Sequence, residues 1–422
     1  MRTDAELIVD PDTYTSGVPY DALTRLREKN VVRIDDSGAG SFWAVFRYDD
    51  VRTVLKSPAI FSSHRGATQI RDPQPDDLKY VQRMMLNQDP PEHSRLRRML
   101  TRAFTPRAVA RLEEGIRANA RRIVAEPSGD FAADVADLPL LTLADVFGVP
   151  RQDRALLYDW SNRVIGFQDA EYALSSSSTA GMTDMALQAV ELRPDDGRDP
   201  RARNGMPDLY AYAHALGAYK RAHPSDDVIS NLMQEDLSLE EFENLFWLFS
   251  VAGNETLRNG IPGGLIALLD HPGQYERLRA DRSLLGTAVE EMLRWWTPVM
   301  HFRRTAIQDT SLSGVEIGAG DKVVVWFSAA NRDERVFTEP DRFDVGRREA
   351  DHLSFGHGPH FCLGAQLART QLRAVFEAVL DLPGRLELAG EVSRLRSNFQ
   401  NGVKHLPVTG GAPPAPGSPA SP

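Results

Sequence analysis

The chain of 422 residues carries a net charge of −10, with 42% hydrophobic and 26% charged residues. These proportions are typical of a soluble globular protein with a large core, and the acidic balance excludes general nucleic-acid binding. Cys362 is the only cysteine, so no intrachain disulfide can form, which favours a reducing cytosol.

The first residues contain neither the apolar core of a signal peptide nor the run of about 20 apolar residues that a membrane span needs. We therefore expect a cytoplasmic protein with no membrane segment. No Gly/Ser-rich or charged linker divides positions 10–408, which predicts a single domain over residues 1–408. Residues 409–422 are rich in Gly, Pro, Ser and Ala, and this composition predicts a disordered tail.

The first 60 residues alternate short strand-like pieces, 31–34 and 42–46, with helical ones. They predict a small lobe that contains a sheet, whereas helical patterns dominate residues 127–235. The expected fold class is therefore mainly α with a smaller β-sheet lobe. Within the helical part, the polar stretch 193–205 contains two prolines and two glycines, which predicts a flexible loop.

Residues 62–86 start polar and turn-rich and end in three apolar residues, Met84, Met85 and Leu86. A surface loop is the simplest interpretation of the polar part. The three apolar side chains fit a place in the core as well as they fit the wall of a ligand pocket.

His93 and Arg97 lie four residues apart in a segment that begins with acid and proline, the signature of a helix start. The spacing places both side chains on one helix face. Taken alone, such a pair indicates a solvated face.

Nine arginines and two acids lie between Arg95 and Arg122, a local reversal in an acidic chain. One interpretation is a solvated helix face with some structural pairs. The other is a basic docking patch for an acidic protein, where such charges mainly raise the association rate. A single-stranded nucleic-acid site would need aromatic side chains among the arginines, and Phe104 alone gives poor support.

Residues 239–269 are apolar nearly all round and predict a helix buried through the core. Glu255 and Thr256 lie within it, and a buried carboxylate and hydroxyl need partners. They predict either a satisfied structural network or a catalytic pair. Pro262 predicts that the helix bends there or is shorter.

The helical stretch 284–296 places Glu291 and Arg294 on one side. An exposed pair of this kind would stabilise the protein little. Strands are then expected around 301–306 and 322–327, and a closing hairpin over 394–408.

Cys362 lies where a loop rich in Gly and Pro runs into a helix that we expect to start at Leu363. Unpaired N–H groups at a helix start favour a negative sulfur. Three roles fit this position: a buried structural thiol, a nucleophile with a positioned His partner, and the axial ligand of a haem.

The spacing of five residues around the cysteine favours the third role: Phe355, Gly358, His360, Cys362 and Gly364. It resembles the haem-binding signature of the cytochrome P450 superfamily, whose haem iron is held by a Cys thiolate. The resemblance implies that haem b lies between the helix bearing Ala252 to Thr256 and the Cys362 loop. It also implies a soluble enzyme of the bacterial type.

The resemblance assigns roles to the motifs found along the chain. Phe355 would pack by the ligand, Gly358 and Gly364 would let the backbone approach the sulfur and the porphyrin, and Glu255 with Thr256 would relay protons. The haem propionates would be held by His93, Arg97, Arg304 and His360. A structural ionic cluster would comprise Glu291, Arg294 and Arg342. The substrate pocket would be apolar: Met85, Phe246, Phe249, Ala252, Val299, Met300, Phe302 and Phe399.

The implied function is a monooxygenase that inserts one oxygen atom of O2 into an apolar small molecule of the sterol, terpenoid, lipid or natural-product class. Electrons would come from a ferredoxin or flavodoxin type donor, which its own NAD(P)H reductase reduces. The donor would dock near Arg95 to Arg122. Two alternatives are a peroxide-driven enzyme of the same fold, which would usually lack Glu255 and Thr256, and a haem-binding sensor without turnover.

Overall fold

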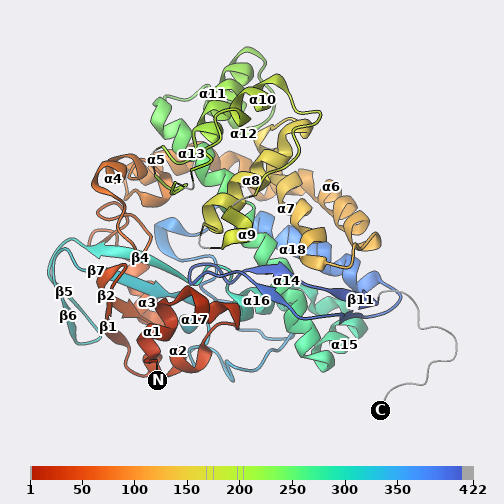
Figure 1. Ribbon diagram of the computed structural model, residues 1–422. Coiled ribbons are helices and arrows are strands. Elements are labelled where there is room, and N and C mark those ends of the chain that lie inside the picture. Colours follow the sequence, from red (N-terminus) through yellow and green to blue (C-terminus); the bar gives the residue numbers. More distant parts are fainter. Residues whose placement is uncertain (1, 168, 174, 197, 203, 411–422) are drawn as a thin grey trace, which may run out of the picture.

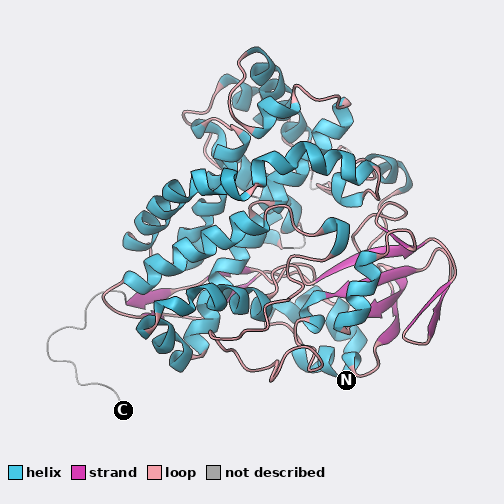
Figure 2. Cartoon of the chain, turned by 180° about the vertical axis from the view of Figure 1, so that it is seen from behind, coloured by secondary structure: helices cyan, strands magenta, loops and turns pink. Residues whose placement is uncertain are grey.

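The computed structural model describes residues 2–167, 169–173, 175–196, 198–202 and 204–410. Helices form most of this part of the chain, and the larger sheet lies near the N-terminus (Figures 1 and 2). The expected fold class, mainly α with a smaller β-sheet lobe, is confirmed.

The helices have the following bounds: α1 (Asp4–Val9), α2 (Tyr20–Arg27), α3 (Tyr48–Lys56), α4 (Pro75–Val81), α5 (Glu92–Thr101), α6 (Pro106–Ala125), α7 (Phe131–Phe147), α8 (Arg154–Ile165), α9 (Ala170–Ala173), α10 (Asp184–Val190), α11 (Pro207–Ala222), α12 (Val228–Leu232), α13 (Leu239–Ala252), α14 (Glu255–Asp270), α15 (Pro272–Ala280), α16 (Leu285–Trp296), α17 (Phe327–Ala330) and α18 (Ala365–Asp381). The strands are β1 (Val31–Asp36), β2 (Gly40–Val45), β3 (Phe61–Ser62), β4 (His301–Ala306), β5 (Thr310–Leu312), β6 (Val315–Ile317), β7 (Lys322–Trp326), β8 (Leu386–Leu388), β9 (Ser393–Arg394), β10 (Val403–His405) and β11 (Val408–Gly410).

The larger sheet has the strand order β1-β2-β7-β4-β3 and joins the two ends of the sequence. The early strand β2 pairs in parallel with the late strand β7, and β7 pairs antiparallel with β4, with His301 opposite Trp326. The N-terminal lobe therefore includes strands β4 and β7, which follow α16 in the sequence.

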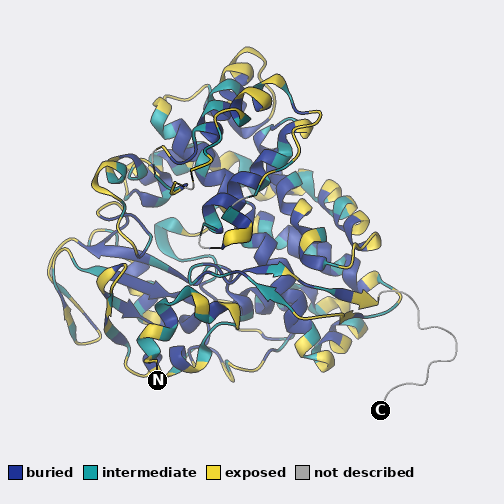
Figure 3. Cartoon of the chain, viewed as in Figure 1, coloured by how far each residue is buried: buried dark blue, intermediate teal, exposed yellow. Residues whose placement is uncertain are grey.

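The largest hydrophobic core lies among the long helices, and α14 is buried along almost its whole length. Figure 3 shows buried residues concentrated on the inner helices, with exposed residues on the outer faces of helices such as α6 and α15. A helix that is apolar on all sides needs such surroundings. None of the described helices is both long enough and apolar enough to cross a membrane.

The helix predicted over residues 239–269 is divided in two. A Ser238–Glu241 capping box begins α13, which ends at Ala252, and α14 begins at Glu255 after a turn at Gly253 and Asn254. Gly253 weakens helix continuity because its backbone is less restricted. Pro262 does not end the helix, because α14 continues through it to Asp270.

The C-terminal boundary also differs from the prediction. Thr409 and Gly410 belong to β11 and pair with β8, so the predicted start of the tail at 409 is wrong by two residues. The rest of the predicted tail, residues 411–422, lies outside the described residues.

Candidate active site

The loop before α18 folds back on itself and places Cys362 at the start of the helix. The Cys362 backbone N–H donates to the Phe355 carbonyl at 2.8 Å. Gly358 has a φ of +70°, and a Cβ there would lie 2.6 Å from the Leu55 carbonyl oxygen, so this loop packs against α3 only with glycine. At Gly364 a Cβ would meet no described atom within 4 Å, so protein packing alone does not require glycine there.

The Cys362 side chain is accessible to solvent, but it lies deep enough among protein atoms for desolvation to raise the pKa of its thiol. The Gly364 backbone N–H and the guanidinium groups of Arg97 and Arg369 lower that pKa, yet the net shift is upward. The predicted stabilisation of a negative sulfur at the helix start is therefore present, but it is smaller than the cost of burial.

Four cationic or potentially cationic side chains gather near Cys362 from three parts of the chain: His93 and Arg97 of α5, Arg304 of β4, and His360 of the cysteine loop. The His93 and His360 rings lie 4.1 Å apart, and the guanidinium groups of Arg97 and Arg304 both act on them electrostatically. Burial lowers the pKa of His93 to about 4 and that of Arg304 to about 10. The sequence prediction that these residues meet is consistent with this geometry.

This cluster lacks the anions that buried cations need. Among the described residues, no carboxylate lies within ion-pair distance of Arg97 or Arg304, and the buried His93 Nδ1 has no hydrogen-bond partner. Asp89 acts on Arg304 and His93, but its carboxylate accepts hydrogen bonds from the Ser62 hydroxyl and the Ser63 backbone N–H. The donor set therefore fits an anionic group such as the two propionates of haem.

Glu255 and Thr256 point to different surroundings. The Thr256 hydroxyl donates to the Ala252 carbonyl at 3.2 Å, and Thr256 lines a pocket. Glu255 is fully buried, accepts from Ser161 at 3.3 Å and Asn259 at 3.1 Å, and pairs with Arg258 at 3.5 Å. Within the described residues, no hydrogen bond joins Glu255 to Thr256.

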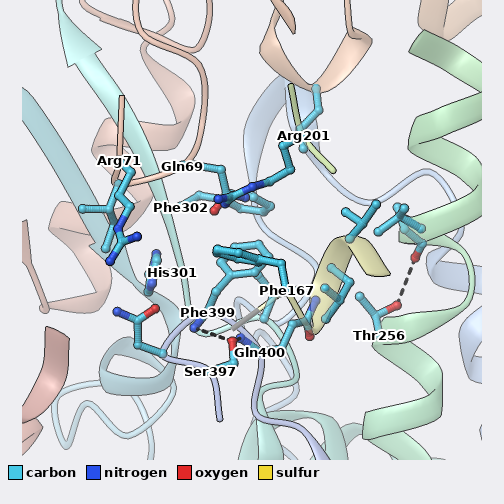
Figure 4. Close-up of a pocket in the computed structure, with 18 of the residues that line it drawn as sticks. Gln69, Arg71, Phe167, Arg201, Thr256, His301, Phe302, Ser397, Phe399 and Gln400 are labelled. Carbon is cyan, nitrogen blue, oxygen red and sulfur yellow. Dashed lines mark hydrogen bonds between the residues drawn. The ribbon is translucent and has the colours of Figure 1, made fainter. Parts of the chain in front are cut away.

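The pocket lies between helices α13 and α14 on one side and the sheet lobe on the other (Figure 4). Its walls include residues 69–71 and 397–400, together with Val164, Ile165, Phe167, Val299, His301 and Phe302, with Arg201 near its edge. Four predicted pocket residues line it: Ala252, Val299, Phe302 and Phe399.

The other four predicted pocket residues do not line it, and this part of the prediction is wrong. Phe246 packs on Trp160 and Tyr212, and Phe249 packs against aromatic rings of neighbouring helices. Met85 and Met300 are buried in the protein interior. On α13 the lining side chains are Trp247, Leu248, Val251 and Ala252.

The sequence did not identify the polar part of the pocket wall: Asp36, Gln69, Arg71, Arg201, His301, Ser397, Asn398 and Gln400. Gln69 and Arg71 belong to the stretch 62–86, for which the sequence predicts a surface loop followed by apolar residues that fit either the core or a pocket wall. Of the three apolar residues at its end, Leu86 lines the pocket. A loop has no regular repeat of apolar and polar residues, so its sequence does not indicate which side chains point toward the pocket.

The predicted ionic cluster forms, but with a different third member. Arg294 binds Glu291 through two hydrogen bonds of 2.7 and 2.9 Å, and Arg347 binds Glu291 at 3.0 Å. Arg342, the predicted partner, pairs with Glu339 on the surface and contributes its carbonyl oxygen to Arg347. The prediction of Arg342 is therefore wrong, because the backbone turns between residues 342 and 347 and brings the later arginine inward.

The nine arginines between Arg95 and Arg122 have different roles. Arg97 points toward Cys362, whereas Arg95, Arg111 and Arg117 pair with acids. The others are exposed and, among the described residues, have no ion pair: Arg98, Arg102, Arg107, Arg121 and Arg122. Part of the predicted basic surface is therefore available to a partner.

A fold of this kind, with one cysteine at the start of a long helix and buried cations beside it, defines a haem-thiolate protein. The cytochrome P450 family model matches residues 220–382. The chain is 36% identical, over 430 aligned residues, to a steroid C26-monooxygenase of Rhodococcus jostii, covering 96% of this chain and 85% of the relative. It is 39% identical to a methyl-branched lipid omega-hydroxylase of Mycobacterium tuberculosis, covering 87% and 83%.

The solved structures agree with the sequence relatives. A cytochrome P450 of Mycobacterium marinum in complex with pseudoionone superimposes with a TM-score of 0.82 at 33% identity, covering 97% of this chain and 98% of that chain. The chain belongs to the cytochrome P450 family. It is a haem-thiolate monooxygenase, and enzymes of this kind in bacteria receive electrons from redox partners.

Proposed function

We propose that the enzyme oxidises an end carbon of an elongated apolar molecule of the steroid or methyl-branched lipid class. The observation that carries this proposal is the pocket, whose apolar walls run from Thr256 past Phe302 and Phe399 (Figure 4). The relatives support the choice of substrate, because one is named for carbon 26 of a steroid and the other for the omega position of a branched lipid.

The cofactor in this proposal is haem b, with Cys362 as the axial ligand. His93, Arg97, Arg304 and His360 would hold its propionates, since Arg97 and Arg304 are cations without carboxylate partners among the described residues, and the neutral rings of His93 and His360 beside them can donate hydrogen bonds. Bound haem supplies the activation of dioxygen that protein side chains cannot perform. In the overall reaction one oxygen atom enters a C–H bond, and the other leaves as water with two electrons and two protons.

Phe355 supports the cysteine side of the site. Its ring lies under the Arg369 guanidinium, 4.5 Å from the ring centre, and Arg369 is held by Glu290 through two hydrogen bonds of 2.7 and 2.8 Å. Phe355 therefore has a fixed position beside the cysteine loop, as its proposed packing by the ligand requires. The Arg369 guanidinium is occupied by its contacts with Phe355 and Glu290.

The proton relay in this proposal runs through Thr256 and Glu255. Thr256 presents a hydroxyl at the pocket wall, while Glu255 holds a carboxylate in a buried network. A relay through both needs a water molecule or a side-chain rotation between them, since they share no hydrogen bond. General acid and base groups of this kind contribute about 10²-fold or more to the rate.

The electron donor in this proposal is a ferredoxin or flavodoxin with its NAD(P)H reductase. Five exposed arginines on and beside α5 and α6 form no ion pair with any described residue, which supports docking of an acidic donor near Arg95 to Arg122. The rate of electron transfer should fall as ionic strength rises.

The test uses the purified holoenzyme with a surrogate ferredoxin, its reductase and NADPH. A strongly red-shifted Soret band in the reduced carbon monoxide complex would show thiolate ligation. Product analysis by mass spectrometry would then compare cholesterol, which has an aliphatic side chain, with testosterone, which lacks one, and with isopalmitic acid. Oxidation at a chain end in cholesterol or isopalmitic acid supports the proposal; oxidation only on the testosterone ring system contradicts it.

A further inference from the structure

The pocket has a polar end that faces away from Thr256. In Figure 4, Arg71 and His301 lie on one side of the pocket and Thr256 on the other, with the rings of Phe302 and Phe399 between them. An apolar chain that reaches Thr256 therefore has its other end near two nitrogen-bearing side chains.

The backbone around Arg71 is anchored by its neighbours in the chain, while the Arg71 side chain is exposed. Asp72 pairs with Arg303 at 2.6 Å and Lys322 at 2.5 Å, which fastens the segment to strands β4 and β7. The Arg303 backbone N–H also donates to the Thr68 carbonyl at 2.9 Å. The backbone on both sides of Arg71 is thus anchored to the sheet, which orders the site before a ligand arrives.

The Arg71 guanidinium itself has no ion pair with any described residue. The nearby carboxylate of Asp36 accepts hydrogen bonds from the backbone N–H groups of Gly38 and Ala39 at 2.9 and 2.6 Å. The other arginine of the pocket, Arg201, pairs with Asp199 and stacks on the Phe167 ring at 3.8 Å. Among the described residues that line the pocket, Arg71 is therefore the arginine without an ion pair.

His301 is a buried polar side chain whose ring nitrogens make no well-formed hydrogen bond within the described residues. It is 2% exposed, and neither ring nitrogen has a hydrogen-bond partner among the described residues. Burial lowers its pKa to about 3 against an opposing hydrogen-bond effect of the Asn398 backbone, so the ring is neutral and offers one N–H donor. Leaving such a group unsatisfied is costly, and His301 lines the pocket.

We propose that Arg71 and His301 bind a carboxylate at the end of the substrate farthest from the oxidised carbon. The substrate is then an aliphatic acid whose chain passes Phe302 and Phe399 and ends beside Thr256. This inference rests on the proposed function, because it uses the position of Thr256 to say which end is oxidised.

The chemistry of the two side chains fits this ligand. A guanidinium binds a carboxylate through two parallel hydrogen bonds, and this geometry is stronger and more selective than a single neutral bond. The neutral His301 ring adds a donor without adding a second charge. A methyl ester keeps the apolar chain but loses the anion, so it separates head-group recognition from chain burial.

The experiment measures binding of isopalmitic acid and its methyl ester to the holoenzyme through the haem spin-state shift. The variants are Arg71→Gln and His301→Phe, with Arg348→Gln as the control because Arg348 is exposed and forms no ion pair among the described residues. We expect the acid to bind about tenfold more tightly than the ester in the unaltered enzyme. Arg71→Gln should weaken acid binding about tenfold and leave ester binding within about twofold.

His301→Phe should also weaken acid binding, by about threefold to tenfold, since one hydrogen bond is lost. Unchanged ester binding in each variant shows that the pocket is folded. Equal binding of acid and ester by the unaltered enzyme, binding of neither, or an acid preference that survives Arg71→Gln would each overturn the proposal. If both compounds are oxidised at the chain end with equal affinity, the head-group inference fails and the proposed function stands; if both bind without chain-end oxidation, the proposed function fails.

Discussion

The two sides of the active site are built in different ways. On the cysteine side, a few residues at fixed spacing on α5, β4 and the loop before α18 form a compact cationic cluster. On the pocket side, the wall is assembled from short loop segments far apart in the sequence, such as 69–71 and 397–400. Binding on the cysteine side therefore depends on charge, and binding on the pocket side depends mainly on the shape of the wall.

This difference determines how each side responds to substitution. A buried cation without its anion is costly, so under the proposed function we expect single substitutions of the residues beside Cys362 to weaken cofactor binding. An apolar wall residue contributes contact area, and a change of volume there alters the substrate range before it prevents folding. Arg71 and His301 are the exception on the pocket side, because they too depend on charge and hydrogen bonding.

The largest expected effect comes from the cysteine side. Cys362→Ala should abolish the red-shifted carbon monoxide band and all turnover, because no second cysteine can replace the ligand. The measurement is the reduced carbon monoxide spectrum and product formation after haem supplementation. The Arg348→Gln variant should keep both signals. Turnover by the Cys362→Ala protein with bound haem would contradict thiolate ligation.

The second prediction concerns the ionic cluster behind the cysteine loop. Arg347→Gln should lower the free energy of unfolding by about 3–5 kcal/mol, because it leaves the buried Glu291 with one partner fewer. Arg342→Gln is the matched control and should change it by less than about 0.5 kcal/mol, because that pair is exposed. Urea denaturation followed by tryptophan fluorescence measures both. Equal effects would mean that Arg347 is not the third member.

The sequence predicted the residues whose spacing is set by the backbone. His93 and Arg97 fall on one helix face, and Glu291 with Arg294 on another, because positions three or four apart are neighbours in any helix. The Cys362 loop was found because its glycines and spacing are specific. These features are local, so the sequence alone contains the information.

The sequence could not indicate which face of a uniformly apolar helix meets the pocket. Phe246 and Phe249 were predicted as pocket residues, but Trp247, Leu248 and Val251 form the lining face of α13. Hydrophobicity is the same on both faces, so only the packing of Phe246 on α8 and α11 decides the orientation. Arg71 was missed for a related reason: it lies in a loop, whose sequence has no periodic pattern that would indicate the direction of its side chains.

The third prediction tests the interactions of Glu290, which hold the Arg369 guanidinium over the Phe355 ring. Burial raises the pKa of the Glu290 carboxyl, but hydrogen bonds from His352 and Arg369 outweigh it and lower the pKa to about 2. A carboxyl with a lowered folded pKa stabilises the protein above its unfolded pKa of about 4.5, and the stabilisation is lost as the pH falls toward the folded value. Glu290→Gln should therefore cost on the order of 2 kcal/mol at pH 7.

The same variant should lose less at lower pH, because the unaltered carboxylate also becomes protonated. The difference in free energy of unfolding between the two proteins should stay constant from about pH 7 to 5 and shrink below about pH 4.5. Glu316→Gln, at an exposed position without an ion pair among the described residues, is the control. A difference that does not depend on pH would show that Glu290 acts through packing alone.

The smallest expected effect separates the two residues of the proposed relay. Thr256→Ala should lower the fraction of NADPH electrons recovered in product about tenfold, with the remainder released as hydrogen peroxide, because the pocket loses its hydroxyl. Substrate binding and stability should change little, since Thr256 makes one local hydrogen bond. Thr256→Ser keeps the hydroxyl and should restore coupling.

Glu255→Gln should behave differently, because Glu255 is held by Ser161, Asn259 and Arg258 within the core. Removing its charge leaves the buried Arg258 without its anion, so stability should fall together with coupling. The comparison is decisive for the relay. If Thr256→Ala loses coupling at unchanged stability, the proton transfer is assigned to the pocket wall. If Thr256→Ala keeps its coupling, Thr256 is removed from the relay and Glu255 is left with a structural role.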